Sequence, residues 1–135
     1  MATKHIIFDT NTWISYFYNG SIQIIANLVY TGRIIIYTTP RQIEELTSVL
    51  HRPKIKKKIL LTADFYTNFV LQVAQLTTID ERFDRLADPN DNYLVDLAYT
   101  AKAHYIVSSD RHLASIKHIG KIQILSLSAF KIKFT

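Results

Sequence analysis

The chain has 135 residues, of which 48% are hydrophobic and 20% charged, and it contains no cysteine. This composition predicts one compact domain over residues 1–135 and excludes disulfides, thiolate catalysis and cysteine-based zinc sites. Sixteen Lys and Arg residues against eleven Asp and Glu residues give a net charge of +5, which suits a polyanionic partner as well as mere solubility. No apolar run reaches the length of a membrane span and no signal-peptide pattern is present, so we expect a cytoplasmic protein without a membrane partner.

The first half of the chain alternates between short β-branched runs and stretches of helical periodicity. Continuous apolar runs are typical of parallel strands covered on both faces, whereas apolar residues spaced three or four apart indicate helices. In chain order we expect a strand at His5–Phe8, helices at Thr12–Tyr18 and Ser21–Thr31, a strand at Ile34–Tyr37, and helices at Arg41–Leu50 and Lys54–Leu60.

The second half continues this alternation. In chain order it predicts a helix at Ala63–Leu76 capped by Thr62, a weak strand at Thr77–Ile79, a helix at Pro89–Ala103, and strands at Tyr105–Val107 and Ile122–Leu125. The inward stripe expected on the first of these helices is Phe65, Phe69, Val73 and Leu76. Strands and helices that alternate in this way predict a three-layer α/β/α sandwich on a mostly parallel central sheet.

Four acidic residues fall where the carboxyl ends of the predicted strands meet. Asp9 and Asp110 follow two strands, Glu45 lies on the helix after the Ile34 strand, and Asp91 lies near the start of a later helix. Sites in open parallel sheets form at this edge, so we expect the four side chains to converge. Each residue also has a purely structural interpretation, as a helix or turn cap or as a solvated helix residue.

Converging carboxylates need protons or a cation, because two unit charges about 4 Å apart repel by about 4 kcal/mol at an effective dielectric near 20. Oxygen-only ligands select hard divalent ions such as Mg²⁺ or Mn²⁺. Such an ion polarises a scissile phosphate and lowers the pKa of an attacking water. The acidic set therefore predicts metal-assisted phosphodiester hydrolysis, with a basic surface holding the nucleic-acid backbone.

Four segments resemble, in order and spacing, the acidic motifs of PIN-domain nucleases: Ile6–Asn11, Ile43–Lys54, Asp88–Leu94 and Ala103–Leu113. The likeness extends over Ile6 to Leu125 and is greatest to the toxin components of bacterial toxin–antitoxin pairs. It implies a Mg²⁺- or Mn²⁺-dependent endoribonuclease with RNA as substrate and an antitoxin protein as partner.

Carried over by position, the resemblance implies that the catalytic and metal-binding set is Asp9, Glu45, Asp91 and Asp110. It makes Asn11 and Ser108 supporting polar residues that orient the carboxylates. The second motif leaves Glu44 or Glu45 as the acidic residue, and we choose Glu45 because Leu46 and Leu50 then take the positions that the motif gives them.

Two further groups of side chains have a functional and a structural interpretation. One is a dense basic run that either contacts RNA phosphates or is a solvated face, made of Arg52, Lys54, Lys56, Lys57 and Lys58. The other is aromatic, made of Trp13, Tyr16, Phe17 and Tyr18. These residues could stack on RNA bases, but core packing or a subunit contact is the favoured interpretation. Because four aromatic residues on a short helix are not all expected to face inward, we also expect an apolar patch for a homodimer or an antitoxin segment.

Two other classes of function remain open at this stage. The first is a catalytically inert module of the same fold that binds RNA or a protein. The second is a phosphoacceptor signalling domain, which also gathers carboxylates around Mg²⁺. That class needs a lysine after a late strand, and Ile122–Leu125 is followed by Ser126-Leu127-Ser128 instead.

Overall fold

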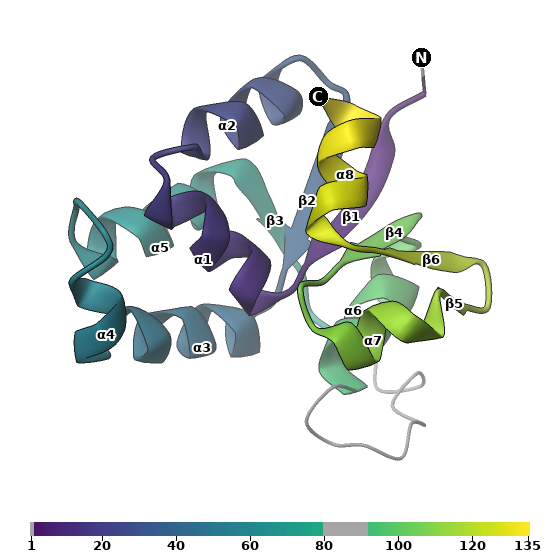
Figure 1. Ribbon diagram of the computed structural model, residues 1–135. Helices are drawn as coiled ribbons and strands as arrows, with labels where there is room; N and C mark the ends of the chain where they lie inside the picture. The colour runs from purple at the N-terminus through teal and green to yellow at the C-terminus, as the bar shows by residue number, and fades with distance from the viewer. Residues whose placement is uncertain (1, 80–91) are drawn as a thin grey trace.

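The structure is a computed structural model that describes residues 2–79 and 92–135 (Figure 1). Its described strands form one sheet in the order β3-β2-β1-β4-β6-β5. Every neighbouring pair in this sheet is parallel except β5 and β6. The strand bounds are β1 Lys4–Phe8, β2 Ile34–Thr38, β3 Ala74–Leu76, β4 Tyr105–Val107, β5 His118–Ile119 and β6 Ile122–Leu125.

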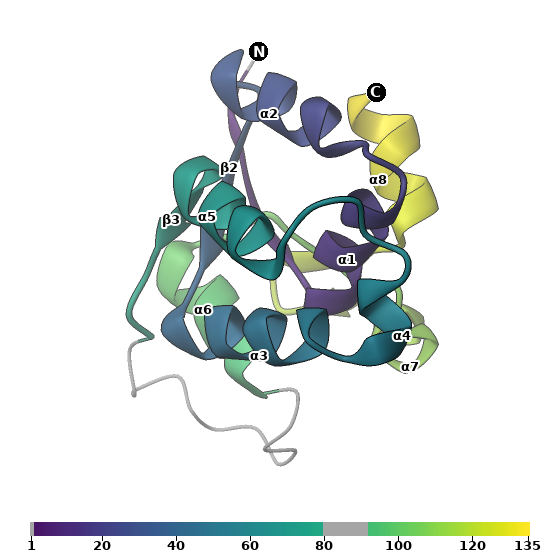
Figure 2. The ribbon, with the colours of Figure 1, turned by 90° about the vertical axis from the view of Figure 1, so that its left-hand side faces the viewer.

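Helices cover both faces of the sheet, as the sequence predicted for a three-layer α/β/α sandwich. Figure 2 shows α2, α3 and α5 in front of the strands and α6 beyond them. The helix bounds are α1 Thr10–Tyr18, α2 Ile22–Tyr30, α3 Pro40–Leu50, α4 Pro53–Lys56, α5 Ala63–Val73, α6 Asn92–Ala101, α7 Arg111–Ile116 and α8 Leu127–Phe134. None of the described helices has the length and apolar content that a bilayer span requires.

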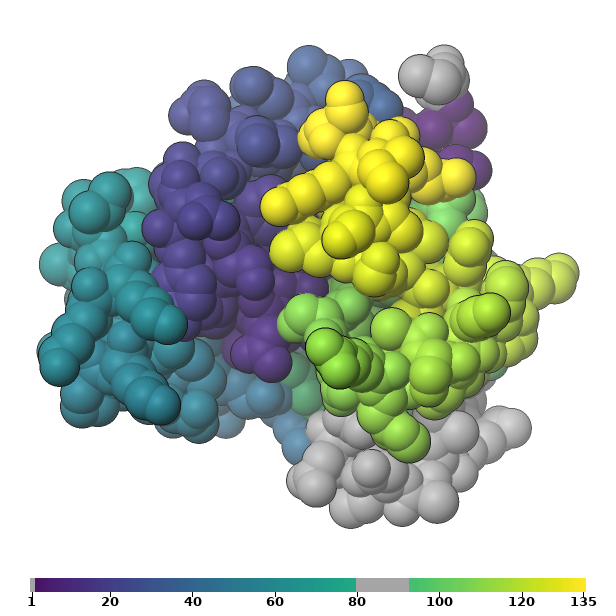
Figure 3. All heavy atoms as spheres, viewed as in Figure 1, coloured from purple at the N-terminus to yellow at the C-terminus, as the bar shows by residue number. Residues whose placement is uncertain are grey.

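The alternating side chains of β1 divide the core into two clusters. Ile6 and Phe8 belong to the larger cluster, together with residues of α1, α2, α3, α5 and α8. Ile7 points to the opposite face and packs with α6, α7 and β6. In the space-filling view the C-terminal segment lies against the N-terminal segments (Figure 3). Beneath this surface the buried rings of Phe8 and Phe130 meet edge to face with 5.3 Å between their centroids. Both faces of the central strand are therefore covered, which explains its continuous apolar run.

The aromatic residues of α1 pack into the core, so the predicted exposed patch is wrong. Trp13, Tyr16 and Phe17 are at most 2% exposed. Tyr18 is half-buried, and the Lys58 amino group lies 5.3 Å from its ring centroid. Since α1 lies between the sheet and neighbouring helices, it is apolar around most of its circumference. The predictions of a homodimer and of a bound antitoxin segment relied on an exposed aromatic patch, and α1 does not present one.

The third strand starts earlier than the sequence predicted. The strand is Ala74–Leu76 rather than Thr77–Ile79, and α5 ends at Val73. Pairing of these residues with Ile36–Thr38 of β2 satisfies their backbone groups along the sheet edge. Local helical periodicity did not reveal this tertiary pairing, and it extended the predicted helix too far.

The predicted inward stripe of α5 is also wrong in part. Phe65 is 42% exposed and Leu76 is 56% exposed. The side chains that α5 buries are Ala63, Tyr66, Val70 and Val73. Tyr66 faces inward because its ring stacks on Phe17 at a centroid distance of 4.5 Å. The capping prediction is confirmed, since the Thr62 hydroxyl accepts a hydrogen bond from the Phe65 amide.

Other elements differ from the prediction in their bounds or were absent from it. Helix α4 is only Pro53–Lys56, and α1 begins at Thr10 because Asp9 caps it. Helices α7 and α8 were not predicted, although Asp110 and Ser126 are their N-caps. The predicted start of the last long helix at Pro89 lies outside the described residues.

Gln42 is a fully buried polar residue that joins three elements. Its Oε1 accepts hydrogen bonds from Trp13 Nε1 at 3.2 Å and from the Thr38 hydroxyl at 2.7 Å. Its Nε2 donates to the Phe8 carbonyl at 2.7 Å. One side chain of α3 therefore holds α1, β2 and the end of β1, directly before Asp9.

We predict that Gln42→Met lowers the free energy of unfolding by about 3 kcal/mol, because it leaves several buried donors and acceptors unpaired. Chemical denaturation followed by the fluorescence of Trp13, which is the single tryptophan, measures the change. Gln72→Met on the exposed face of α5 is the control, and it changes stability by no more than about 0.5 kcal/mol. Equal stability of the two variants contradicts the prediction.

Candidate active site

The central parallel strands β1 and β4 end side by side. Their register pairs Phe8 with Val107, and the Asp9 amide donates to the Val107 carbonyl at 3.0 Å. The loops after the two strands therefore begin at the same edge of the sheet. This edge is where open parallel sheets form their sites.

The Asp9 carboxylate is 7% exposed and accepts three hydrogen bonds. Oδ1 accepts from the Thr12 amide at 2.7 Å, which caps α1. Oδ2 accepts from the Ser108 hydroxyl at 2.6 Å and from the Ser109 amide at 3.2 Å. Because these donors come from both strand ends, they orient the carboxylate and join α1 to the β4 loop at once.

Ser108 connects two of the predicted acidic residues. It is fully buried, and its hydroxyl donates to Asp9 while accepting from the Asp110 amide at 3.0 Å. Asp110 is exposed, and its Oδ1 accepts from the His112 amide at 2.9 Å, which caps α7. Asp9 and Asp110 thus each cap a helix, which is the structural interpretation that the sequence left open, and they also lie at the same edge.

A small cavity of about 140 Å³ opens at this edge. Its lining includes three of the four predicted carboxylates and both predicted supporting residues; the lining residues are Asp9, Thr10, Asn11, Glu45, Tyr93, Leu94, Ser108, Asp110 and Leu113. Glu45 reaches the cavity from α3 and is half-buried, whereas Glu44 is exposed and does not line it. Asp91, the fourth predicted carboxylate, lies outside the described residues.

Tyr93 lines the cavity but was not among the predicted site residues, although it lies in the third motif. It is 5% exposed, and burial raises the pKa of its phenol, with a further rise from its hydrogen bond to Glu45. The Arg41 guanidinium carbon lies 4.6 Å from the centroid of its ring. An aromatic residue two positions after a predicted ligand was the signal that could have identified it.

The donor chemistry of the cavity fits a hard divalent ion. The polar lining groups offer oxygen, and Glu45 Oε1 is buried without a hydrogen-bond partner among the described residues. Within residues 2–79 and 92–135, however, no three acidic, histidine or cysteine side chains lie close enough to hold one ion. The described carboxylates supply oxygen ligands, and the fourth predicted carboxylate, Asp91, lies outside these residues.

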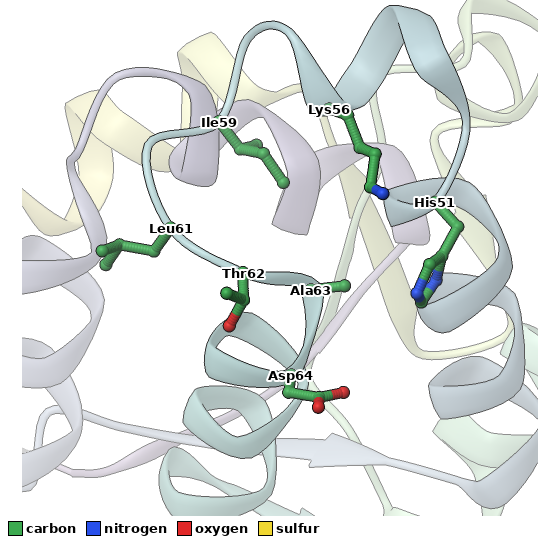
Figure 4. Close-up of a pocket in the computed structure, with 7 residues that line it drawn as sticks. All are labelled: His51, Lys56, Ile59, Leu61, Thr62, Ala63 and Asp64. Carbon is green, nitrogen blue, oxygen red and sulfur yellow. The ribbon is translucent and has the colours of Figure 1, made fainter.

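The basic run begins after the C-terminal end of α3, the helix that carries Glu45 to the acidic cavity. From Glu45 to Leu50, the last residue of α3, the helix rises by about 7.5 Å. Lys56 lines a second cavity of about 370 Å³ (Figure 4), together with His51, Ile59, Leu61, Thr62, Ala63 and Asp64. This cavity is larger than the first. Its lining contains one carboxylate, from Asp64, whereas the cavity at the sheet edge contains three.

Comparison with known proteins identifies one family and one relative. A family model described as PIN domain matches residues 5–112, a range that includes Asp9, Glu45, Asp91 and Asp110. An uncharacterized protein of Methanocaldococcus jannaschii is 27% identical over 124 residues, which cover 86% of this chain and 77% of that protein.

We predict that Ser108→Ala lowers the free energy of unfolding by about 2 kcal/mol, since it removes a buried hydrogen bond to a charged acceptor and leaves the Asp110 amide without its partner. Denaturation followed by Trp13 fluorescence measures this change. Ser109→Ala is the matched control, because Ser109 contacts Asp9 through its backbone amide, which the substitution keeps. Equal losses in both variants rule out a specific role for the Ser108 hydroxyl.

Proposed function

The chain belongs to the PIN-domain family, and on this premise we propose that it is a Mg²⁺- or Mn²⁺-dependent endoribonuclease that hydrolyses RNA phosphodiester bonds in the cytoplasm. The observation that carries the proposal is the cavity at the carboxyl edge of β1 and β4, which Asp9, Glu45 and Asp110 line together. The carboxylates that line this cavity suit a cation, whereas the net charge of +5 on the whole chain suits a polyanion such as RNA.

The acidic residues would divide the work of holding the ion. Asp9 and Asp91 would bind it directly, and Asp110 directly or through water. When bound, the ion polarises the scissile phosphate and lowers the pKa of the attacking water. Ser108 and the Thr12 amide hold the Asp9 carboxylate in one orientation. Glu45, whose Oε1 is buried and has no partner among the described residues, would bind the ion or accept a hydrogen bond from the attacking water.

The basic run gives the RNA backbone a second place to bind. Its five residues are exposed and lie on and around α4, which follows the helix that carries Glu45, so an RNA strand that crosses the cavity can continue over them. Contacts of this kind are independent of sequence and weaken as salt concentration rises. The members proposed to contact RNA are Arg52, Lys54, Lys56, Lys57 and Lys58.

We predict that the protein cleaves single-stranded RNA with Mn²⁺ or Mg²⁺ and that EDTA abolishes cleavage. Asp9→Asn lowers kcat by at least about 100-fold, because even residues that merely support metal ligands cost 10- to 100-fold when lost. Asp64→Asn, which removes an exposed carboxylate in the second cavity, leaves cleavage unchanged. Gel analysis of an end-labelled RNA gives both rates, and full activity of Asp9→Asn would falsify the mechanism.

The alternative is a catalytically inert module that binds RNA or a protein. It is favoured by one observation, namely that the described residues include no three-ligand group. Calorimetric titration with Mn²⁺ separates the two functions. Binding that Asp9→Asn abolishes supports the nuclease, whereas no heat at millimolar Mn²⁺ supports the inert module.

We further propose that the protein acts as a toxin that an antitoxin protein restrains. Induced expression without a partner is then expected to arrest bacterial growth, since cleavage of cellular RNA stops protein synthesis. Expression of Asp9→Asn at equal level serves as the control and permits growth. Arrest by both variants, or by neither, contradicts the toxin role.

A further inference from the structure

A third cavity, of about 470 Å³, opens at the end of the sheet opposite the acidic cavity. Figure 1 shows the elements that meet there, which are the amino end of β1, the turn from α2 to β2, and the C-terminal end of α8. We call it the amino-edge cavity, and its lining residues are Ala2, Lys4, Thr31, Gly32, Arg33, Lys133 and Phe134. A volume of this size lies within the range of about 300–1,000 Å³ that ligand sites occupy.

Three cations converge on the amino-edge cavity from segments that are far apart in the sequence. Lys4 begins β1, Arg33 directly precedes β2, and Lys133 lies in the last turn of α8. The segments around them supply no carboxylate side chain, since residues 2–8, 10–43 and 111–135 contain neither Asp nor Glu. Within the described part of the chain, none of the three forms an ion pair. No ion pair therefore offsets their mutual repulsion.

Most of the N–H donors of these cations are unused. Arg33 Nη1 donates to the Phe134 carbonyl at 2.5 Å, which uses one of the five donors of the guanidinium. The Lys133 amino group lies 5.5 Å from the Tyr105 ring centroid and makes no hydrogen bond to the described residues. Lys4 makes no side-chain hydrogen bond to them either. All three side chains therefore keep donors for an anion.

Helix ends account for only part of this positive charge. Helix α2 ends at Tyr30 and α8 ends at Phe134, both beside the cavity. Each helix C-terminus carries about half a negative charge, so the two together offset about one of the three positive charges. Arg33 and Lys133 have this structural role, whereas Lys4 lies at the start of a strand, where no helix end accounts for it. An excess of about two positive charges is left, which suits an anionic group.

We propose that the amino-edge cavity binds a terminal phosphate of an RNA strand, with Lys4, Arg33 and Lys133 as the contacting residues. A phosphate monoester carries a charge of about −1.5 to −2 at pH 7 and has three strong acceptor oxygens. Both properties match a cavity with this excess charge and three cations from three different elements. A backbone phosphodiester or a carboxylate carries one negative charge, so each matches less well.

RNA is named as the ligand because the inference rests on the proposed nuclease function. Hydrolysis of a phosphodiester adds water across one P–O bond, so one product end keeps the phosphate as a monoester and the other becomes a hydroxyl. The proposed reaction therefore makes ends of this kind. Lys4 and Asp9 are five residues apart on extended backbone, or about 16 Å, so the phosphate site is separate from the acidic cavity.

Fluorescence anisotropy in EDTA tests the phosphate site without any need for cleavage. Three internally labelled single-stranded RNAs of one sequence carry a 5′-phosphate, a 3′-phosphate or hydroxyls at both ends. The wild type is expected to bind one of the phosphorylated strands about 10-fold more tightly than the hydroxyl strand, as one charge-assisted contact provides. In Lys4→Ala and in Lys133→Ala this preference falls below about threefold, because part of the contact with the phosphate is lost.

Lys121→Ala is the matched control, because it removes the same charge from an exposed lysine that does not line the amino-edge cavity. It keeps the full preference for the phosphorylated strand. Circular dichroism checks that each variant is folded. Equal affinity of the wild type for all three strands, or the full preference in folded Lys4→Ala, overturns the inference.

Two other anions test for a different occupant. Adenosine monophosphate and a Glu-rich peptide are each titrated against the wild type and Lys4→Ala. Binding of either one that depends on Lys4, together with equal affinity for the three RNA strands, assigns the cavity to a free nucleotide or to an acidic protein segment and overturns the choice of RNA.

Failure of this inference and failure of the nuclease proposal give different results. A protein that cleaves RNA with Mn²⁺ but shows no preference among the three strands refutes the phosphate site and leaves the nuclease. A preference that Lys4→Ala reduces, in a protein that does not cleave, refutes the nuclease and leaves the phosphate site.

Discussion

The hydrogen bonds that converge on the Asp9 carboxylate organise the whole carboxyl edge of the sheet. One oxygen caps α1 through the Thr12 amide, and the other accepts from Ser108 and Ser109 after β4. The Ser108 hydroxyl also accepts a hydrogen bond from the Asp110 amide, and the Asp110 side chain caps α7. A single buried carboxylate therefore begins one helix, ties two loops together and positions a second acidic residue. The same hydrogen bonds that make Asp9 the cap of α1 also orient its carboxylate at the cavity.

The chain belongs to the PIN-domain family, and its structure shows several features of the cavity that family membership alone does not specify. The acidic cavity is small and lies on a basic protein. Tyr93 adds an aromatic ring to the cavity lining, and the Arg41 guanidinium carbon lies 4.6 Å from the centroid of that ring. Gln42, three residues before Glu45 on α3, holds the end of β1 in place through the Phe8 carbonyl. One helix thus supports the strand that presents Asp9 and also carries a carboxylate to the cavity.

Most strands of the sheet could be predicted, because buried parallel strands have continuous apolar runs that no other element of this length requires. Errors arose where tertiary contacts override local periodicity. Leu76 continues the helical spacing of α5 but lies in β3, since backbone pairing with β2 is available there. Trp13, Tyr16 and Phe17 looked too numerous for one buried face, yet α1 has neighbours on nearly every side. Burial depends on those neighbours and not on the helix alone.

The amino-acid sequence by itself determined which residues end the central strands, and so it placed Asp9 and Asp110 at one edge of a parallel sheet. Strand direction and the alternation of elements suffice for that inference, because carboxyl ends of parallel strands must lie together. The motif register favoured Glu45 over Glu44, but only the tertiary structure decided that the Glu45 side chain lines the cavity and that Tyr93 lines it too, with its ring against Arg41. Packing against neighbouring elements sets the rotation of a helix about its axis. Those neighbours are distant in sequence, so the spacing of apolar residues along the helix does not identify them.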